Sequence, residues 1–351
     1  MKKILFIAGV GLDAPSHVGG ELTKNRVLLS YLKKKISNEY ILTVVDTYKW
    51  NRKPVRVIGR ILFEYIFGKN DHVLISVATR SALKLLKIFD SLWWIKKAKI
   101  TYLVIGGTLP TKLEQNPKMK DSLKKCLFIC PETKDMVRYL NRLGLSNTLH
   151  VPNFKEFSFV PTAKSTKRSR LRIVFFSRVN KEKGVELAVK AVKHLSGTYN
   201  IDLDIYGPVD PGYKTEFAEL MSSTENIHYK GVLKPDINET YEILSKYDLM
   251  VFPTFHEGEG FPGALIDAYI AGLPVLASDW KYNSEIVKEG TTGWLAKPKD
   301  LQDFSRKLEF ILQHKEQLVS MRAKCLEEAQ RYNAGDVLPK MLKDMGIKVS
   351  E

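Results

Sequence analysis

The sequence predicts an α/β protein built from two doubly wound parallel sheets. Short apolar runs such as Ile100 to Ile105 and Leu171 to Phe176 have the composition of strands that are buried on both faces of a sheet. These runs alternate with segments of helical spacing, which is typical of βαβ units. A length of 351 residues is too large for one ordinary core, so we expect two domains.

Positive charge is concentrated in the first part of the chain. Residues 1–150 contain 27 Lys+Arg and 11 Asp+Glu, whereas the remaining residues contain 28 of each. Such a field attracts anionic partners, which include nucleic acid, acidic substrates and anionic lipid. The alternative is a generic solubilising surface. In the sequence, no apolar run approaches the ~18 residues of a membrane span.

The first domain is predicted to open with a β-α-β unit. Its strands are Lys2 to Gly9 and Ile41 to Asp46, and its helix runs from Gly20 to Lys35. Further segments follow the same logic: strands at Val73 to Val77, Ile100 to Ile105 and Leu127 to Cys130, a helix at Glu132 to Gly144, and a last short strand at Thr148 to Pro152.

The loop after the first strand formally fits a dinucleotide fingerprint. Gly9, Gly11 and Ala14 have the required spacing, and Asp46 ends the next strand. Pro15 and several further loop residues delay the helix, which weakens the match. A nicotinamide-dependent oxidoreductase therefore stays an alternative, and it predicts cofactor binding to the first domain.

Two patches of the first domain combine basic and aromatic residues. Arg52, Lys53, Arg56 and Arg60 precede an apolar run that ends at Phe67. The second patch, Ser91 to Lys97, places two tryptophans beside two lysines. Such combinations suit a membrane interface, where a ring is half buried and an ammonium stays in water. The alternative is a helix that faces the core and has a solvated basic side.

Residues 152–170 are predicted to link the domains, because they combine prolines, Ser/Thr and a basic cluster of Lys164, Lys167, Arg168 and Arg170. The second domain then starts with the strand Leu171 to Phe176. The elements expected after it are a helix at Val185 to Leu195, strands at Ile201 to Tyr206 and Ile227 to Gly231, a helix at Pro235 to Lys246, a strand at Asp248 to Phe252, a helix at Asp300 to Glu328 and a final helix at Val337 to Met345.

The stretch from Phe252 to Asp279 carries the clearest chemical signal. A glycine-rich turn, Gly258 to Gly263, leads into a short helix that starts near Pro262, and Pro274 to Ser278 forms the next strand. A helix N-terminus binds anions, most often phosphate. The carboxylates of Glu259 and Asp267 bracket the turn, and carboxylates accept hydrogen bonds from sugar hydroxyls. The arrangement predicts a nucleotide-sugar pocket.

The same stretch resembles a known family. Glu259-Gly-Phe-Pro-Gly-Ala-Leu-Ile-Asp267 is similar to the paired acidic motif of the retaining glycosyltransferases of family four, the group 1 transferases of bacterial polysaccharide synthesis. The resemblance extends from about Ile173 to Leu295, and more weakly over the first half. Asp267 replaces the second glutamate that is usual in the family, and its side chain is one methylene shorter.

The resemblance implies a GT-B fold, in which two Rossmann-like domains face each other across a cleft. We expect an acceptor domain at residues 1–160, a nucleotide-sugar domain at 161–333, and a C-terminal helix at 334–351 that packs back toward the first domain. The donor diphosphate is expected at Arg178 and Lys183, the transferred sugar at Glu259 and the ribose at Asp267. The remaining donor-site residues that the resemblance implies are Gly20, Val232, Leu233, Gly260, Phe261, Pro262 and Gly263.

The function implied is retaining transfer of a sugar from a nucleotide-diphosphate donor, with a UDP-sugar favoured, to a glycan or lipid-linked acceptor in cell-surface polysaccharide synthesis. No metal, no separate cofactor and no nucleic acid are expected. The protein is expected in the cytoplasm, attached peripherally to the inner face of the membrane through its anionic lipids. A nucleotide-sugar epimerase, which shares the two-sheet plan, remains an alternative.

Two assignments stay open at this point. The run Glu257-Gly-Glu259 offers two acidic side chains, and only the register with the family favours Glu259. Three histidines, His17, His72 and His256, were considered as acid–base groups and none is assigned, because a loop histidine is more often held by ordinary hydrogen bonds.

Overall fold

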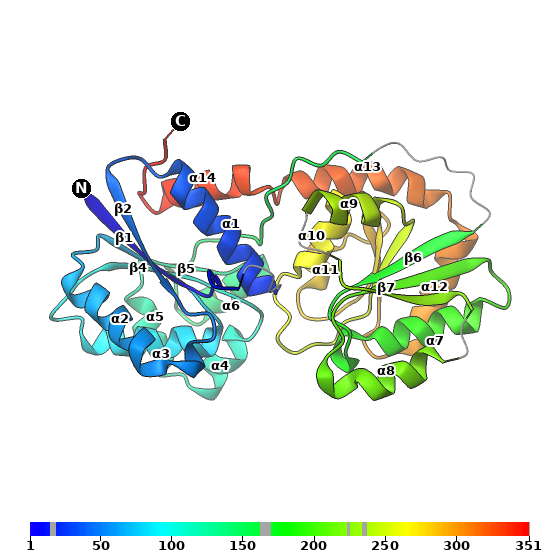
Figure 1. Cartoon of the computed structure of the whole chain (residues 1–351), viewed down its shortest axis with the longest axis horizontal. Coiled ribbons are helices and arrows are strands. Elements are labelled where there is room, and N and C mark those ends of the chain that lie inside the picture. The colour runs from blue at the N-terminus through cyan, green and yellow to red at the C-terminus, as the bar shows by residue number, and fades with distance from the viewer. Residues whose placement is uncertain (15–18, 162–169, 223–224, 234–236, 351) are drawn as a thin grey trace. The chain divides into compact units, whose positions relative to one another are not determined.

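The computed structural model describes residues 1–14, 19–161, 170–222, 225–233 and 237–350. The chain divides into two compact units (Figure 1). Unit 1 contains residues 1–156 and 333–351, and unit 2 contains residues 157–332. Each unit is described by itself.

Unit 1 is built on a five-stranded parallel sheet in the order β2-β1-β3-β4-β5. The strands are β1 (Lys2–Ala8), β2 (Tyr40–Asp46), β3 (His72–Ser76), β4 (Lys99–Leu103) and β5 (Phe128–Cys130). The chain leaves β1 toward β2 and then returns to the other side of β1 with β3. The switch point of this sheet therefore lies between β1 and β3, outside their carboxyl ends.

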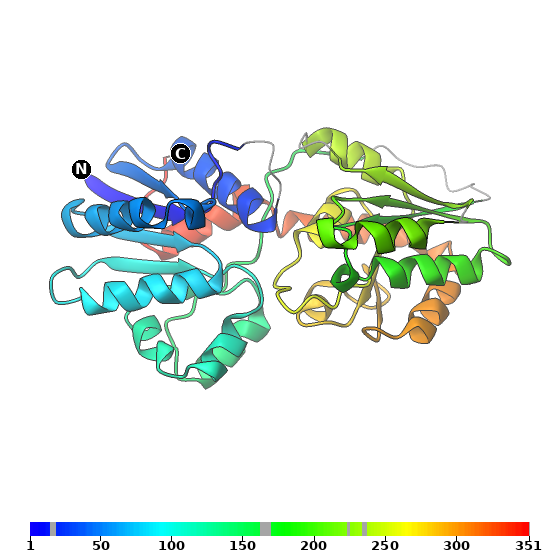
Figure 2. The ribbon, with the colours of Figure 1, turned by 60° about the horizontal axis from the view of Figure 1, so that its bottom comes forward.

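Helices cover both faces of this sheet. On one face, α1 (Gly20–Lys35) and α14 (Ala334–Asp344) share a core with Ile4, Phe6 and Leu74 of the sheet. The opposite face carries α2 (Pro54–Phe67) and α3 (Thr79–Ser91), which lie side by side in Figure 2. The smaller helices are η1 (Trp50–Arg52), α4 (Leu109–Gln115), α5 (Met119–Lys124) and α6 (Lys134–Arg142).

Unit 2 has a six-stranded parallel sheet in the order β11-β10-β9-β6-β7-β8. The strands are β6 (Leu171–Phe176), β7 (Ile201–Tyr206), β8 (Ile227–Gly231), β9 (Leu249–Phe252), β10 (Val275–Ser278) and β11 (Gly293–Ala296). The switch point lies between the neighbouring strands β6 and β9. Successive strand residues enter opposite cores: Ile173 and Phe175 pack on one face, and Val174 packs on the other.

The helices of unit 2 form a layer on each face of the sheet (Figure 1). The layer formed by α7 (Val185–Leu195), α8 (Lys214–Met221) and α12 (Leu301–Gln313) packs in the same core as Phe175. The other layer is formed by α9 (Ile237–Ser245), α10 (Gly263–Ile270) and α13 (Gln317–Gln330). The short helices are η2 (Lys181–Lys183), η3 (Pro211–Tyr213) and α11 (Asn283–Ile286).

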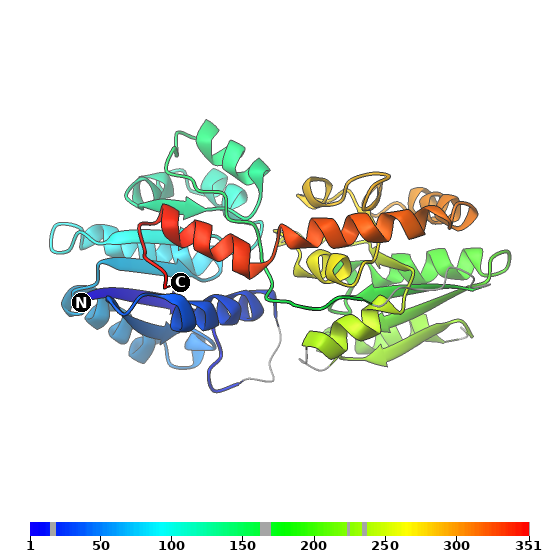
Figure 3. The same ribbon diagram turned by 90° about the horizontal axis from the view of Figure 1, so that it is seen from above.

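The chain crosses between the units twice. Phe157 and Phe159 pack against the core of unit 2, so this unit begins a few residues earlier than the expected position 161. Near the C-terminus, α13 belongs to unit 2, whereas the next helix, α14, packs in the core of unit 1 through Leu338 and Leu342 (Figure 3). Residues 162–169, which include Lys164, Lys167 and Arg168 of the predicted linker, lie outside the described residues, as do His17 and Pro235.

Two sequence predictions of secondary structure are wrong. Residues Thr148 to Pro152 form no strand, because the segment makes one isolated bridge with β5, between Ile129 and Thr148, and a few further backbone bonds. The predicted helix from Asp300 to Glu328 is two helices that break at His314. Phe304 of α12 and Met321 of α13 pack in one core of unit 2, whereas Cys325, farther along α13, packs in the core on the other face.

Candidate active site

An ion pair lies at the switch point of the unit 2 sheet. Lys183 follows β6, Glu259 follows β9, and these strands are neighbours, so their carboxyl-end loops meet. Lys183 Nζ lies 2.5 Å from Glu259 Oε2. The sequence assigned these side chains to different parts of a donor, and the structure places them in direct contact.

The pair is largely withdrawn from solvent. Glu259 is 8% exposed, and its Oε2 also accepts a hydrogen bond of 2.9 Å from Thr254 Oγ1. The ammonium of Lys183 lies 6.0 Å from the centroid of the Phe252 ring. A charge in so dry a position depends on its partner, because an unpaired buried charge is costly. The two residues therefore act as one fixed dipole at the carboxyl ends of β6 and β9.

Arg178 stands on the same loop as Lys183 but is more exposed. Its Nε lies 3.7 Å from Asp210 Oδ1, and more than half of its side chain is accessible. Asn180 connects the two cations: its Oδ1 accepts from the backbone N–H of Lys183 at 2.9 Å, and its Nδ2 donates to Asp210 Oδ2 at 2.7 Å. The loop thus holds one buried and one solvent-facing positive charge.

Gly184 fixes how closely the two loops approach. Its φ is +75°, and a Cβ at this position would lie 2.1 Å from the carbonyl oxygen of Pro253. Only glycine satisfies both conditions without displacing the backbone. The contact between Lys183 and Glu259 therefore depends on the residue that follows Lys183.

The N-terminus of α10 lies directly after Glu259 in the chain. Pro262 occupies the N-cap position, and Gly263 is the first helical residue, as the sequence predicted. The first N–H groups of a helix have no intrahelical partner and attract anions. Gly260 precedes them in the turn. Phe261 is buried with its ring 5.1 Å from the ring of Tyr332, so only its backbone could meet a donor.

Asp267 faces α9 from the middle of α10. It is 8% exposed, and its Oδ1 accepts a hydrogen bond of 3.0 Å from Tyr241 Oη. Burial, followed by the neighbouring Asp267 carboxylate, raises the pKa of Tyr241 well above its ordinary value. The phenol therefore remains a donor at neutral pH. Tyr241 was not predicted as a partner, and the role of Asp267 toward ribose stays a prediction.

The geometry distinguishes Glu259 from Glu257. Glu257 is exposed and pairs with Lys281 at 2.8 Å, and this hydrogen bond lowers the pKa of its carboxyl. His256 Nδ1 lies 2.5 Å from Glu182 Oε2. Of the two carboxylates, that of Glu259 is the one held at the carboxyl ends of β6 and β9.

The other predicted donor residues are less constrained. Val232 and Leu233 follow β8; Val232 is exposed, and Leu233 packs partly against the core. In unit 1, Gly20 is the first residue of α1, and a Cβ built on it meets nothing within 4 Å. Steric crowding therefore gives no reason for glycine at position 20.

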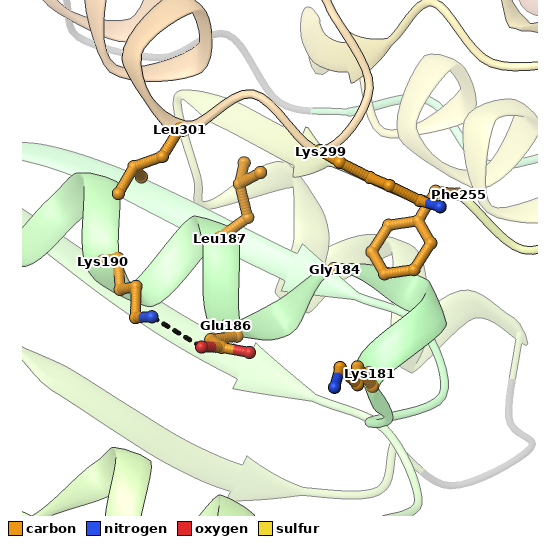
Figure 4. Close-up of a pocket in the computed structure, with 8 residues that line it drawn as sticks. All are labelled: Lys181, Gly184, Glu186, Leu187, Lys190, Phe255, Lys299 and Leu301. Atoms are coloured by element: carbon orange, nitrogen blue, oxygen red, sulfur yellow. Dashed lines mark ion pairs between the residues drawn. The ribbon is translucent and has the colours of Figure 1, made fainter.

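A pocket of about 380 Å³ lies on the α7 side of the Lys183 loop (Figure 4). Lys299 Nζ lies 4.8 Å from the centroid of the Phe255 ring, and Glu186 pairs with Lys190 at its rim. The pocket shares Gly184 with the loop of the ion pair, but Lys183 and Glu259 are not among the residues that line it. It is a neighbour of the candidate site and does not contain it.

The corresponding edge of unit 1 uses its polar groups internally. Asp46 accepts hydrogen bonds from the backbone N–H groups of Val10, Leu12 and Tyr48. Burial raises the pKa of Asp46, but these hydrogen bonds outweigh it and hold the pKa below the ordinary value. Arg26 donates to the carbonyls of Val10, Gly11 and Ala14. The loop of the dinucleotide fingerprint is thus bound to the protein itself.

One titratable group of unit 1 escaped the sequence analysis. Glu21 lies in the first turn of α1, and its Oε1 lies 2.8 Å from where a Cβ of Gly9 would be. Burial raises the pKa of Glu21 to about 7. Beside it, Asn25 Nδ2 donates to the carbonyls of Gly9 and Ser76. A glycine directly after a strand, Gly9, could have indicated that a side chain packs closely against the backbone there. The spacing of residues in the sequence does not identify that side chain as Glu21.

Within the described ranges, no group of three or more His, Cys, Asp or Glu side chains is arranged to hold a metal ion. Among the same residues, no helix has the length and apolar character that a membrane crossing requires.

The fold and the site define a two-unit α/β protein with a charged, helix-capped edge in its second unit. Residues 159–332 match the family model of the glycosyl transferases group 1. The chain belongs to this family through the unit that carries Lys183 and Glu259. The resemblance identified from the 259–267 motif is confirmed.

Curated relatives are similar over part of the chain. The amylovoran biosynthesis glycosyltransferase AmsK of Erwinia amylovora is 30% identical over 139 residues, which is 38% of this chain and 33% of that protein. A Campylobacter jejuni N,N'-diacetylbacillosaminyl-diphospho-undecaprenol alpha-1,3-N-acetylgalactosaminyltransferase is 26% identical over 117 residues, or 33% of this chain and 30% of that protein. The matched part spans about a third of each relative's length.

Solved structures resemble the whole chain. Anabaena HepE, in complex with UDP, has a TM-score of 0.76 at 13% identity and covers 99% of this chain and 100% of its own. The lipopolysaccharide outer core galactosyltransferase WaaB has a TM-score of 0.68 at 17% identity, with 98% of both chains covered. The GT-B fold predicted from the sequence is confirmed.

Proposed function

We propose that this protein is a retaining glycosyltransferase of bacterial cell-surface polysaccharide synthesis. It moves a sugar from a nucleotide-diphosphate donor, a UDP-sugar, to a glycan or lipid-linked acceptor. The observation that carries the proposal is the Lys183–Glu259 pair at the β6/β9 switch point, next in the chain to the N-terminus of α10. A cation, a helix N-terminus and a carboxylate at one edge match the parts of a sugar diphosphate.

The donor diphosphate binds at the positive groups of this edge. The N–H groups at the start of α10, Lys183 and the solvent-facing Arg178 receive the charge that develops on the leaving phosphate. They supply the positive charge that a divalent metal supplies elsewhere, so transfer is metal-independent. Glu259 accepts hydrogen bonds from hydroxyls of the transferred sugar, and its contact with Lys183 fixes the ammonium beside the phosphate. Asp267, held by Tyr241, accepts from the ribose.

The reaction exchanges one bond at the anomeric carbon for another. The bond from C1 to the β-phosphate oxygen breaks, and its electron pair leaves with the nucleoside diphosphate. A bond forms between C1 and the acceptor oxygen, on the face from which the diphosphate departs, so the configuration is retained. The acceptor hydroxyl loses its proton to the departing diphosphate, which balances the step without another reactant.

The choice of donor and acceptor draws on related proteins. HepE has been crystallised with UDP-glucose, which supports a UDP-sugar as the donor. The name of the C. jejuni relative describes transfer to a diphospho-undecaprenol carrier, which supports a lipid-linked acceptor and attachment of this protein to the inner face of the membrane. The epimerase alternative is not favoured, because an epimerase needs no acceptor and the relatives are transferases. The oxidoreductase alternative is not favoured either, because the backbone of the loop that would hold the cofactor, after β1, is already hydrogen-bonded to Asp46 and Arg26.

A thermal-shift screen of nucleoside diphosphates and their sugars tests the proposal first, since a ligand that binds only the folded state raises its Tm. We expect UDP and one or more UDP-sugars to stabilise the full chain, and turnover with a polyprenyl-diphosphate glycan acceptor to survive EDTA. NMR of the product should show the anomeric configuration of the donor. If no nucleoside diphosphate raised the Tm, the donor site would be refuted, and an inverted product would refute retention alone.

A further inference from the structure

A group of exposed apolar side chains lies on α2 and on the turn after α3. The α2–Trp94 surface is defined here by apolar Val55, Phe63, Phe67, Trp94 and Ile95, with basic Arg52, Lys53, Arg56, Arg60 and Lys97. All five apolar side chains are more than half exposed, and Trp94 is 86% exposed. Exposed apolar patches of this kind mark interaction sites.

The two parts of this surface are joined in the structure. Tyr65, on the buried side of α2, donates a hydrogen bond of 3.1 Å to the carbonyl of Lys96 in the turn. Its ring stacks on Phe89 of α3 at a centroid distance of 4.0 Å. The two helices lie side by side on one face of the sheet (Figure 2). The C-terminal ends of α2 and α3 lead into β3 and β4. Phe67 and Trp94 therefore both lie toward the end of the sheet where these two strands begin.

The aromatic side chains are presented to solvent and are not in the core. Ile61 and Tyr65 form the buried stripe of α2, and Phe63 and Phe67 lie on the opposite side of the helix. Their rings are 5.4 Å apart. The indole N–H of Trp94 donates to the carbonyl of Ser91 at 3.1 Å, so the hydrogen bond is satisfied within the turn while the ring stays exposed.

Charge selects the partner of this surface. Among the described residues, none of its five basic side chains has an ion pair with an acid, and Glu64 is the one acidic residue in the sequence of α2. A second copy of the same surface would bring like charges together. Single-stranded nucleic acid would use the cations and the rings, but it gives no role to the exposed aliphatic side chains of Val55 and Ile95. An anionic bilayer accepts both kinds of side chain, because its headgroups are negative and its interface takes up aromatic rings.

We propose that the α2–Trp94 surface docks on an anionic lipid bilayer, with Phe63, Phe67, Trp94 and Ile95 in the interface and the basic residues against the headgroups. The inference deepens the proposed membrane attachment by assigning it a surface. It needs no sugar transfer and can therefore be tested apart from that reaction. A helix of fourteen residues lying flat provides an anchor about 21 Å long.

Sedimentation of the full chain with vesicles tests the proposal. The vesicles are phosphatidylcholine alone, or phosphatidylcholine with phosphatidylglycerol. We expect strong binding only to the anionic vesicles, weakened about 10-fold or more by Arg56→Glu/Arg60→Glu, since each basic residue near such a surface contributes on the order of 1 kcal/mol. Phe63→Gln/Phe67→Gln/Trp94→Gln should weaken binding to a similar degree.

Matched controls lie in unit 2. Phe310→Gln/Val319→Gln removes exposed apolar groups, and Lys315→Glu/Lys324→Glu reverses exposed charges, so both variants should bind like the wild type. Equal binding of the surface variants and the wild type would overturn the proposal, as would a wild type that binds polyuridylate and no vesicle. Surface variants should keep UDP binding, whereas a failure of the proposed transfer site would appear as lost UDP binding with unchanged sedimentation.

Discussion

The two units use the same kind of sheet edge in different ways. At the β6/β9 switch point of unit 2, Lys183 and Glu259 come from two loops and meet beside a helix N-terminus. At the β1/β3 switch point of unit 1, Asn25 binds the strand-end carbonyls and Asp46 binds backbone N–H groups. Topology provides a candidate site in both units, and in unit 2 two oppositely charged side chains from the loops of the switch point meet there.

The comparison separates topology from chemistry. A doubly wound sheet places loops together at its switch point whatever their sequence. Whether the edge binds a ligand depends on which polar groups the fold has already used. Unit 1 uses the groups of its glycine loop to hold that loop, and its excess positive charge lies elsewhere, including the α2–Trp94 surface.

The largest effect is expected from removing the ion pair of unit 2. Lys183→Met/Glu259→Gln removes a cation from the leaving group and a carboxylate from the sugar, so kcat/KM for transfer should fall on the order of 10³-fold. Because both charges are removed together, no unpaired buried charge remains, and the free energy of unfolding should change little. Steady-state transfer and urea unfolding measure the two quantities.

The control for this variant is the neighbouring exposed pair. Lys281→Met/Glu257→Gln removes an ion pair of similar length between the loops that follow β10 and β9. Its kcat/KM should stay within about 2-fold of the wild type, since exposed pairs contribute little. Equal losses in both double variants would show that the Lys183–Glu259 pair has no special role.

Gly184→Ala tests the close approach of the two loops through stability. The backbone of Gly184 has a φ of +75°, which residues with a side chain rarely adopt. A Cβ at this position would also clash with the carbonyl oxygen of Pro253. We expect a loss of about 3 kcal/mol or more in the free energy of unfolding, by analogy with other strained backbone positions. Gly197→Ala is the matched control, because nothing lies within 4 Å of its Cβ. If Gly184→Ala were as stable as Gly197→Ala, the close approach would not be required.

The buried carboxyl of Glu21 in unit 1 should make the stability of the protein depend on pH. The pKa of Glu21 is raised by burial from 4.5 to about 7, so its contribution to stability is full below the unfolded value and is lost as pH rises through the folded value. Glu21→Gln should remove this loss, which makes the variant more stable than the wild type above about pH 7 and similar to it below about pH 5. Urea unfolding across this range measures the difference, and parallel curves would contradict the assignment.

The smallest effect is expected at Asp267. Tyr241→Phe removes the hydroxyl that donates to Asp267 Oδ1 and leaves the ring in place. If Asp267 binds the ribose, a less well oriented carboxylate should raise the KM for the donor a few-fold while kcat changes little. A change of this size in KM corresponds to about 1 kcal/mol, which is the net contribution of one hydrogen bond. A KM equal to that of the wild type would separate Tyr241 from donor binding.

Much of the fold could be predicted because its signals are local. The apolar run 171–176 and the helical spacing of 185–195 give the correct limits of β6 and α7. The break at His314 could not be predicted, since the apolar spacing continues through it. Likewise, the Thr148 segment has strand composition, but one isolated bridge to β5 and a few backbone hydrogen bonds do not make it a strand.

The site was predicted less completely than the fold. The motif identified Glu259 and the helix at Gly263, because glycine, proline and acidic residues occur there at fixed spacing. The contact of Glu259 with Lys183 depends on strand order, which places residues far apart in sequence on adjacent loops. The Tyr241–Asp267 bond and the burial of Glu21 depend on packing between helices and neighbouring backbone, for which the sequence has no periodic signal.

A crystal structure of the full chain with UDP tests the central claim most directly. The account predicts that the diphosphate lies within about 3.2 Å of the N–H groups at the start of α10 and of Lys183 Nζ, with Glu259 beyond it on the sugar side. A diphosphate bound instead at the loop between β1 and α1 of unit 1, or in the pocket beside Phe255, would contradict it.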